Sequence, residues 1–488
     1  MKTTEKNLSP GFGGEVALRL PGSLAAVLQK HMRQDPNNEQ MAFGLASTAR
    51  TAEGVLLPVT ELLLPDRHDL SEQTAVSVSP TLNFQSFVYF RAYQTSKVIV
   101  EFHSHPGAGT PRFSGIDDAH APRNARYIAR KMPGSVTLAL VVGNSCFDAF
   151  DAMVYDRNLK DFRPIRRLEM LGRPSQIRLI GEPADVLLGQ NNTIFDRQTR
   201  VPGWNQLLWE RQLIGIVGLG GNGAPLFQTL VGMGAGRQGF YALVDPDRVE
   251  VSNLPRIPYA LPEHVGLPKV TVATQFAGRK DPRLPVYPFP CRFAEEAVLK
   301  RLKMVTVLFG CGDNDGLRKE TNEFAVRYGI PYIDLGCDIQ TDVGATFAGG
   351  QVRLSLPGEN ACLVCCGGYD ASQAAIDQLD EGSRSQRAAH GCGQDATEVG
   401  MASVANLNGL TAQFAVTQFL SLINGPKFAT WDYLHFDSLT GRTLPARSER
   451  SPACPLCGDE GCLGAGDPIP AEVVAPGPSK LRRLLLKP

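Results

Sequence analysis

The stretch that decides the fold of the larger part of this chain is residues 213–256, LIGIVGLGGNGAPLFQTLVGMGAGRQGFYALVDPDRVEVSNLPR. An apolar run enters a glycine turn, a helical segment follows, and a second apolar run ends at Asp245. This order of strand, tight turn, helix and strand predicts an open α/β unit in which phosphate approaches bare backbone at a helix N-terminus. The carboxylate after the second strand is placed to hold a ribose hydroxyl. The turn glycines, which we expect to bind the nucleotide, are Gly218, Gly220, Gly221 and Gly223.

The residues that follow the second strand narrow the choice of nucleotide. NAD, flavin and ATP all use a glycine turn of this kind. A dinucleotide has no evident use for additional polar and cationic side chains just after the ribose carboxylate, whereas a triphosphate does. An NAD-dependent oxidoreductase is therefore disfavoured, and ATP is the expected ligand. The side chains expected to contact it are Asp245, Asp247, Asn253, Arg256 and Lys269.

Several of these motifs together resemble the activating enzymes of ubiquitin-like proteins, a superfamily that includes the ThiF/MoeB-like adenylyltransferases of sulfur carriers. The motifs are GLGGNG, DPDRVEVSNLPR, GLPK at 266–269 and GDN at 312–314, and the resemblance covers roughly residues 193–460. It implies that Asp313 holds magnesium and the adenylate, and that Asn314 belongs to the same site. Ile257 departs from the pattern, since the family often has Gln there.

The same resemblance implies two further roles. Arg197 lies in FDRQTRVPGWNQLLWERQ, which resembles the family's opening helix, and it matches an Arg that homodimers insert into the partner's nucleotide site. A homodimer is therefore expected, and a surface salt bridge is the alternative for Arg197. Cys392, flanked by glycines, falls where thioester-forming members can carry the acceptor cysteine. An inert thiol is the alternative for Cys392.

Two C-x-x-C pairs in this half, Cys362/Cys365 and Cys454/Cys457, predict one closed structural zinc site. The chain is expected to be cytoplasmic, which favours metal binding over disulfides. The pairs are far apart in sequence, so their joining in one site rests on the resemblance. Cys366 and Cys462 are possible substitutes for a ligand, or free thiols.

A second group of candidate residues lies in KVIVEFHSHPGAGTPRFSGIDD, residues 97–118. On an extended segment His103 and His105 face the same side, and at a helix start Ser114 and Asp117 share a face. Two histidines and an aspartate leave the fourth position of a tetrahedral zinc ion open for water. Zinc lowers the pKa of such a water toward ~7, and a nearby carboxylate can accept its proton.

This pattern resembles the JAMM zinc metalloproteases, which cleave ubiquitin-like proteins from their conjugates. The resemblance implies that the two histidines and the aspartate hold the metal, that Ser114 is the oxyanion donor and that Glu39 is the general base. Glu101 is nearer in sequence, but it ranks second because we expect it to alternate differently from the histidines. The spacer between His105 and Ser114 is one residue longer than the family usually has. A surface HxH loop followed by a helix cap is the alternative.

Composition limits the remaining function classes. Lys plus Arg and Asp plus Glu are equal at 49 each, so no basic excess indicates nucleic acid or a membrane surface as a partner. The N-terminal segment lacks a signal-peptide core, and no run approaches the roughly 18 apolar residues of a membrane span. We expect an α/β multidomain chain. Its parts are a JAMM metalloprotease domain at 1–160, a linker at 161–192, a Rossmann-like ThiF-type adenylation domain with the zinc site at 193–463 and a flexible tail at 464–488.

Together these features predict a two-enzyme fusion in a ubiquitin-like pathway. The C-terminal half is expected to bind Mg–ATP and adenylate the C-terminus of a ubiquitin-like protein, then pass it to Cys392 as a thioester for a conjugating enzyme. The N-terminal half is expected to hydrolyse a peptide or isopeptide bond after the same tail. Such pairings resemble bacterial ubiquitin-like conjugation operons, some linked to phage defence. The alternatives are sulfur-carrier activation in cofactor biosynthesis, and a ubiquitin-like-binding scaffold whose protease half is inactive.

Overall fold

The computed structural model describes residues 14–106, 111–114, 123–128, 137–143, 150–156, 161–179, 193–340, 347–379, 402–425 and 428–468. The chain divides into two compact units. The first unit comprises Met1–Met170, Gln176–Gly189 and Gly464–Pro488, and the second comprises Leu171–Ser175 and Gln190–Leu463. Among the described residues, every helix is too short or too polar to cross a membrane.

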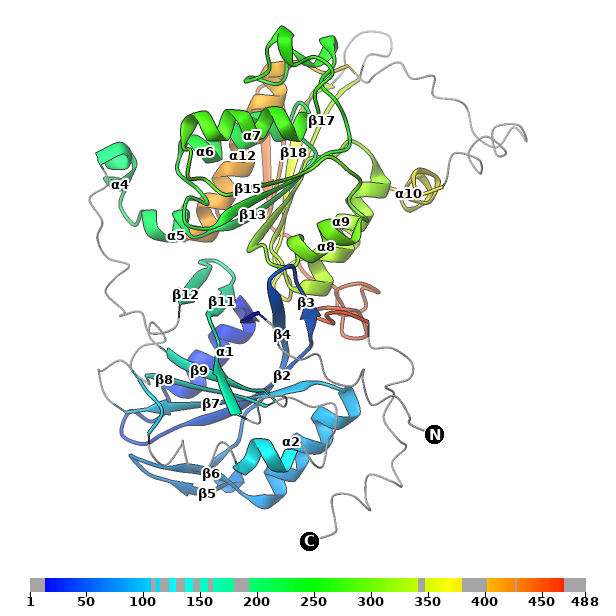
Figure 1. Ribbon diagram of the computed structural model, residues 1–488. Helices are drawn as coiled ribbons and strands as arrows, with labels where there is room; N and C mark the ends of the chain where they lie inside the picture. Colours follow the sequence, from blue (N-terminus) through cyan, green and yellow to red (C-terminus); the bar gives the residue numbers. More distant parts are fainter. Residues whose placement is uncertain are drawn as a thin grey trace, which may run out of the picture. The chain divides into compact units, whose positions relative to one another are not determined.

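The first unit is built on one mixed sheet with strand order β10-β9-β8-β7-β2-β4-β1-β11-β12, in which β3 also pairs with β4 (Figure 1). Its strands are β1 (Glu15–Pro21), β2 (Met41–Ala46), β3 (Ala49–Arg50), β4 (Gly54–Leu63), β7 (Val98–His105), β8 (Thr137–Gly143), β9 (Phe150–Asp156), β10 (Asp161–Pro164), β11 (Arg167–Leu171) and β12 (Gln176–Leu179). A 3-10 turn, η1 (Arg67–Asp69), precedes a separate hairpin of β5 (Leu70–Gln73) and β6 (Val78–Pro80).

Two helices provide the apolar side chains that cover this sheet. Helix α1 (Gly22–Met32) packs in one core with Val100 and Phe102 of β7, and helix α2 (Leu82–Thr95) packs in another core with Ile99. Successive strand residues point to opposite faces, so β7 contributes to both cores. The apolar segments EVALRLP, MAFGLAST and VLLPVTELLL lie in β1, β2 and β4. The segments GSLAAVLQKHMRQ and LNFQSFVYFRAYQTS contain α1 and α2.

The expected linker at 161–192 is wrong for its described part, because β10, β11 and β12 belong to the first sheet. One basic residue of this segment, Arg167, has a structural role in the sheet. Glu169 of β11 is fully buried and accepts hydrogen bonds from Arg19 Nε and Arg167 Nε, each at 2.6 Å. A buried carboxylate is tolerated only when it is paired, and these two arginines are the partners of Glu169.

The start of the expected flexible tail is also wrong, since residues 464–468 pack on the first unit. The backbone N–H of Asp467 donates to the Thr48 carbonyl oxygen at 2.8 Å, and its carboxylate accepts from the Arg50 N–H at 2.7 Å. Gly466 has φ +66, and a Cβ there would lie 2.5 Å from the Thr48 oxygen. Because residue 466 is glycine, the backbone can approach Thr48 this closely. Residues 469–488 lie outside the described part of the chain.

The second unit is built on a sheet with strand order β15-β14-β13-β16-β17-β18-β19-β20. The pairs from β15 to β17 are parallel and those from β17 to β20 are antiparallel. Strand β13, LIGIV, is buried at every position, as expected for a strand covered on both faces. The strands are β13 (Leu213–Val217), β14 (Phe240–Val244), β15 (Val286–Phe289), β16 (Val307–Gly310), β17 (Tyr332–Gln340), β18 (Phe347–Ser355), β19 (Tyr433–Asp437) and β20 (Arg442–Ala446).

The helices of the second unit connect these strands and cover the sheet (Figure 1). They are η3 (Thr193–Phe195), α4 (Asp196–Thr199), α5 (Gln206–Glu210), α6 (Gly223–Gly232), η4 (Val251–Asn253), η5 (Pro262–His264), α7 (Lys269–Lys280), α8 (Glu296–Leu302), α9 (Asp315–Tyr328), α10 (Ala371–Asp377) and α12 (Ala405–Asn424). The expected opening helix is two short helices, α4 and α5, because Pro202 and Gly203 lie between them and Gly203 adopts φ +81.

Candidate functional site

The glycine turn between β13 and α6 forms one wall of a large cavity. Gly218 adopts φ +92, and a Cβ there would lie 2.9 Å from the Cys311 carbonyl carbon. A Cβ on Gly223 would come closer than 3.0 Å to the Gly218 carbonyl oxygen, whereas a Cβ on Gly220 would meet nothing within 4 Å. Gly218 and Gly223 therefore let the turn close on itself, and Gly220 leaves bare backbone facing the cavity.

Asp245, which directly follows β14, holds the glycine turn through a hydrogen bond to its backbone. Its carboxylate is buried and accepts hydrogen bonds from the Leu219 N–H at 2.6 Å and the Asp247 N–H at 2.8 Å. Burial raises the pKa of Asp245, and the Lys269 ammonium and these two N–H donors oppose the rise. One side chain thus fixes both the glycine turn and the start of the following loop, and it also lines the cavity.

The cationic and amide side chains predicted for phosphate gather on the same cavity. Lys269, the first residue of α7, places Nζ 2.8 Å from the Asp247 carboxylate and 4.0 Å from that of Asp245. Asn253 closes the short helix η4, and the Arg256 N–H donates to its carbonyl oxygen at 2.9 Å. This compact turn brings the amide and the guanidinium to one wall.

The cavity extends from the glycine turn past the carboxyl end of the neighbouring strand β16, where Asp313 lies exposed. Asn314 caps α9, its side-chain oxygen accepting from the Leu317 N–H at 2.8 Å. Ligands of open α/β sheets bind outside the carboxyl ends of the strands, which is where this cavity of about 1440 Å³ lies. Of the residues predicted to bind the nucleotide, Gly223 packs against Gly218 and does not line the cavity. The others line the cavity: Gly218, Gly220, Gly221, Asp245, Asp247, Asn253, Arg256, Lys269, Asp313 and Asn314.

A polar network beside the glycine turn was not predicted from the sequence, although three of its residues, Asn222, Cys337 and Asn408, line the cavity. The Asn222 side-chain oxygen accepts from Asn408 Nδ2 of α12 at 2.9 Å and lies 3.1 Å from the Cys337 thiol of β17. The Cys337 sulfur also lies 2.8 Å from the Thr411 hydroxyl. This network ties the turn to the sheet and to α12. An Asn within the glycine turn was the available sequence signal, but its partners are far away in the chain.

Of the two remaining predicted catalytic residues of this half, the structure describes one. Arg197 lies on α4 with its side chain exposed, and it is not among the described residues that line the cavity. An ion pair at this short helix joins Asp196 to Arg200, the residue that follows it, at 2.6 Å. Cys392 lies outside the described residues.

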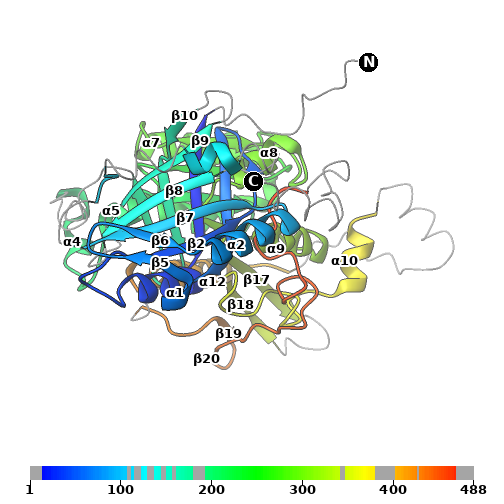
Figure 2. The same cartoon turned by 90° about the horizontal axis from the view of Figure 1, so that it is seen from below.

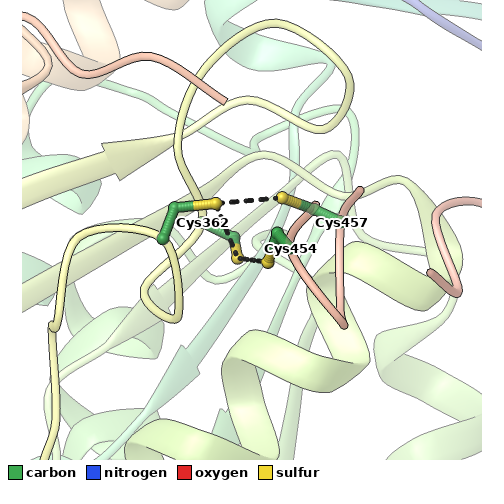
Figure 3. A group of neighbouring side chains, drawn as sticks. Cys362, Cys454 and Cys457 are labelled. Atoms are coloured by element: carbon green, nitrogen blue, oxygen red, sulfur yellow. Dashed lines mark hydrogen bonds between the residues drawn. The ribbon is translucent and has the colours of Figure 1, made fainter. Parts of the chain in front are cut away.

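The two C-x-x-C pairs come together in the second unit (Figure 3). The four sulfur atoms of Cys362, Cys365, Cys454 and Cys457 lie within 4.8 Å of one another. The sulfur atoms of Cys362 and Cys454 are 3.8 Å apart, and those of Cys365 and Cys457 are 3.4 Å apart. Four sulfur atoms bound to one zinc ion in a tetrahedron, with zinc–sulfur bonds of about 2.3 Å, lie about 3.8 Å from one another, which is close to these distances. A hydrogen bond from the Cys457 thiol is the main cause that lowers the pKa of Cys362. The donor set therefore fits a structural zinc ion.

The extra cysteines near this cluster are not part of it. The Cys366 thiol donates to the Cys362 carbonyl oxygen at 3.3 Å, and burial raises its pKa. Cys462 packs against the same small apolar cluster as Cys454 and Cys457. Both thiols thus surround the four-sulfur group, which agrees with the choice of the C-x-x-C pairs as ligands.

In the first unit, the sheet brings together three residues of the second candidate site. Strand β2 pairs antiparallel with β7, with Met41 opposite His103, and continuing this register places Glu39 opposite His105. A Glu39 carboxylate oxygen lies 3.5 Å from His105 Nε2, and the rings of His103 and His105 have centroids 5.1 Å apart. Glu39 and His103 are both 6% exposed. Two imidazoles and a buried carboxylate therefore share one end of the sheet.

The other residues of this candidate site have different outcomes. Ser114 is described and partly buried, and Asp117 lies outside the described residues. Glu101 does not alternate with the histidines as expected, because strand residues two apart share a face and Glu101 therefore lies on the same face as His103. The distinction comes from position along the strand. Glu101 is paired with Phe43 within the ladder, whereas Glu39 is at the end of the sheet beside His105.

Comparison with known proteins identifies the second half of the chain. The model of the ThiF family matches residues 195–456. The sulfur carrier protein adenylyltransferase of Thermus thermophilus is 30% identical over 257 residues, which are 51% of this chain and 84% of that protein. The sulfur carrier protein ThiS adenylyltransferase of Escherichia coli is 26% identical over 253 residues, or 52% and 88%. A crystal structure of Escherichia coli MccB with succinimide aligns with a TM-score of 0.43 at 19% identity, covering 57% of this chain and 77% of that one.

Proposed function

This chain belongs to the ThiF family, and from that premise we propose that its second unit adenylates the C-terminal carboxylate of a ubiquitin-like or sulfur-carrier protein. The observation that carries the proposal is the composition of the cavity. The cavity lies at the carboxyl ends of parallel strands and is lined by the glycine turn and by the buried carboxylate of Asp245. It is also lined by the amide of Asn253, the cations of Arg256 and Lys269, and the exposed carboxylate of Asp313. The relatives named above carry sulfur-carrier adenylation in their own names, which supports this substrate class.

In the proposed reaction, an oxygen of the tail carboxylate attacks the α-phosphorus of ATP. The bond from that phosphorus to the bridging oxygen breaks, and pyrophosphate leaves with the electron pair. Asp245 holds the ribose, backbone at Gly220 approaches the phosphates, and Arg256 and Lys269 neutralise their charge. Asp313 would hold Mg²⁺, which when bound supplies further neutralisation of the phosphates. The protein contributes mainly position and electrostatics.

The experiment is ATP–pyrophosphate exchange driven by a panel of ubiquitin-like and sulfur-carrier proteins with free C-termini. Asp313→Ala is expected to reduce exchange by at least about 100-fold, the usual effect of removing one electrostatic contact at a reacting centre. Glu296→Ala is the matched control, since Glu296 is an exposed carboxylate on α8 that pairs with Lys300 and does not line the cavity. Undiminished exchange in Asp313→Ala would refute the site.

Two finer parts of the proposal concern assembly and the acceptor. Arg197 is exposed on α4 and matches a residue that acts across a dimer interface, so we propose a homodimer in which each copy completes the other's nucleotide site. The acyl group is then proposed to pass to Cys392 as a thioester for a conjugating enzyme. Transfer to a sulfur donor is the alternative, and the identity of the acceptor distinguishes the two pathways. The four cysteines would hold zinc, which would link two distant segments and add folding free energy.

A second activity is favoured by the cluster at Glu39, His103 and His105, and we propose that the first unit is a zinc-dependent protease for the same class of substrate. The separation of 3.5 Å between Glu39 and His105 supports it, because a general base must lie beside the groups that hold the metal. His103, His105 and Asp117 would hold zinc, which when bound supplies Lewis acidity and an acidified water. Glu39 would accept the proton, and Ser114 would donate to the oxyanion. The alternative is a scaffold that binds ubiquitin-like proteins without cleaving them.

A further inference from the structure

Helix α10 lies against the first turn of α9, beside the nucleotide cavity (Figures 1 and 2). The described segment that contains it ends at residue 379. The side chains of Asp377, Gln378 and Leu379 line the cavity together with Asp313. The end of α10 therefore forms one wall of the cavity in which we place the reaction. The contacts between α10 and α9 keep this wall in position.

The first turn of α9 receives α10 through hydrogen bonds at both ends. At the start of α10, the Asp370 N–H donates to the Asp315 carboxylate at 3.0 Å. At its end, the Asp377 carboxylate accepts from the Gly316 N–H at 3.0 Å. The other Asp377 oxygen accepts from Gln373 Nε2 at 2.8 Å, which fixes the orientation of the carboxylate. Free N–H groups at a helix start favour such an anionic partner.

The residue after the helix adds a further pair of contacts. Lys319 Nζ donates to the Gln378 side-chain oxygen at 3.0 Å, and Gln378 Nε2 donates to the Glu320 carboxylate at 3.2 Å. The apolar contribution is small by comparison, because within α10 the buried residue is Ala374. An element held by exposed polar contacts opens at lower free energy than one held by a core, so α10 can leave α9 without unfolding the unit.

Gly316 makes the close approach possible. A Cβ on this residue would lie 2.7 Å from the Asp377 Cβ, closer than real side chains come. Its φ is outside the left-handed region, so alanine fits the α9 backbone and favours the helix. Gly316→Ala is therefore a substitution that pushes α10 away while leaving α9 intact.

We propose that α10 is a polar latch that closes the Asp313 side of the cavity and keeps water from the acyl-adenylate, with Gly316 and Asp377 as positioning residues. The inference rests on the proposed adenylation. In the loss reaction, a water oxygen attacks the acyl carbon and the bond from that carbon to the AMP phosphate oxygen breaks. AMP leaves, the carboxylate is regenerated, and one ATP is consumed without transfer. Excluding water from a reactive intermediate is a known use of a closed wall.

The experiment compares two rates on the full chain. One is ATP–pyrophosphate exchange, driven by whichever carrier protein is most active in the panel described above. The other is AMP release with the same carrier and no conjugating enzyme or sulfur donor present. In Gly316→Ala and Asp377→Ala, the ratio of AMP release to exchange is expected to rise by about tenfold, which corresponds to a barrier lowered by about 1.4 kcal/mol.

Two control variants separate the latch from general damage. Asp377→Asn keeps an acceptor for the Gly316 N–H and is expected to restore the wild-type ratio. Ser372→Ala changes an exposed residue of α10 and is expected to leave both rates unchanged. Hydrogen exchange over residues 371–379 is measured in parallel, and it is expected to accelerate in Gly316→Ala and Asp377→Ala.

The outcomes distinguish the latch from the reaction itself. If wild type shows no exchange with any carrier, the proposed adenylation fails. If exchange persists and the ratio stays at the wild-type value while α10 is shown to be released, the latch is wrong. Unchanged hydrogen exchange in Gly316→Ala would also overturn it, because the steric argument would then be wrong. Should Gly316→Ala fail to fold, Asp377→Ala and Asp377→Asn still give the comparison.

Discussion

Two glycines of the same turn, Gly220 and Gly223, are expected to respond to alanine in opposite ways. At Gly223 the added Cβ would overlap the Gly218 carbonyl oxygen, a backbone atom that cannot rotate away. At Gly220 the added Cβ would meet nothing within 4 Å, and φ is outside the left-handed region. One substitution therefore perturbs the fold, and the other perturbs only the cavity.

The magnitudes follow from these contacts. Overpacking at Gly223 costs about 1–3 kcal/mol, and each kcal/mol lowers the thermal midpoint of a unit of this size by roughly 2–4 °C. Gly220→Ala is expected to be neutral or to stabilise by about 0.4–1 kcal/mol, because it restricts the unfolded chain. Its methyl group would block a hydrogen bond from backbone to phosphate, worth about 1.5–3 kcal/mol. That loss weakens Mg–ATP binding by roughly 10- to 100-fold.

The assay measures both quantities for each variant, with calorimetric unfolding for the second unit and titration with Mg–ATP for affinity. Gly220→Ala is expected to lose affinity with an unchanged or higher midpoint, and Gly223→Ala to lose several degrees. Wild-type affinity in Gly220→Ala would refute the placement of phosphate over this backbone. A wild-type midpoint in Gly223→Ala would refute the packing argument.

Three further predictions concern the metals, the protease and the dimer. Replacing Cys454 and Cys457 by Ser is expected to remove one zinc per chain and lower the thermal midpoint markedly, since a four-thiolate site contributes folding free energy; full zinc content by elemental analysis would contradict this. Glu39→Gln is expected to reduce cleavage of a ubiquitin-like protein extended at its C-terminus by at least about 100-fold with zinc retained, and Ser114→Ala by a comparable factor. Normal cleavage by Glu39→Gln together with loss in Glu101→Gln would show that the base is misassigned. Mixing Arg197→Ala with Asp313→Ala is expected to recover part of the exchange, because one composite site is then intact; no recovery despite proven subunit exchange would count against action in trans.

The nucleotide site could be predicted from sequence because its parts are local. Strand β13, the turn, α6 and β14 are continuous in the chain, and the apolar runs and glycines specify each in order. The side chains predicted for phosphate follow β14 in the chain, Asn253 and Arg256 at the short helix η4 and Lys269 at the start of α7. Asp313 follows an apolar strand, and adjacent parallel strands end at the same edge. The fold rule for such sheets was then enough to bring these residues to one cavity.

Other contacts could not be predicted because they join segments that no local pattern relates. The buried pair of Arg19 and Glu169 spans 150 residues, and without it the basic segment at 161–179 resembles a linker. The Gly316–Asp377 contact spans 61 residues and depends on the absence of one Cβ. The cysteine pairs lie 92 residues apart, so only the family resemblance could join them before the structure did. In each case, tertiary packing brings together two residues that are far apart in the sequence.

The proposed reaction requires a protein carboxylate to attack ATP in the cavity of the second unit. The most direct test uses a carrier protein whose C-terminal carboxylate is labelled with oxygen-18, incubated with this chain and Mg–ATP until AMP is released. Carboxylate attack on the α-phosphorus leaves one tail oxygen on the phosphate when the acyl carbon is later attacked. Mass spectrometry is therefore expected to find AMP carrying one oxygen-18 atom with wild type, and no such AMP with Asp313→Ala. Unlabelled AMP from wild type would mean that water attacks the nucleotide, and it would contradict the account.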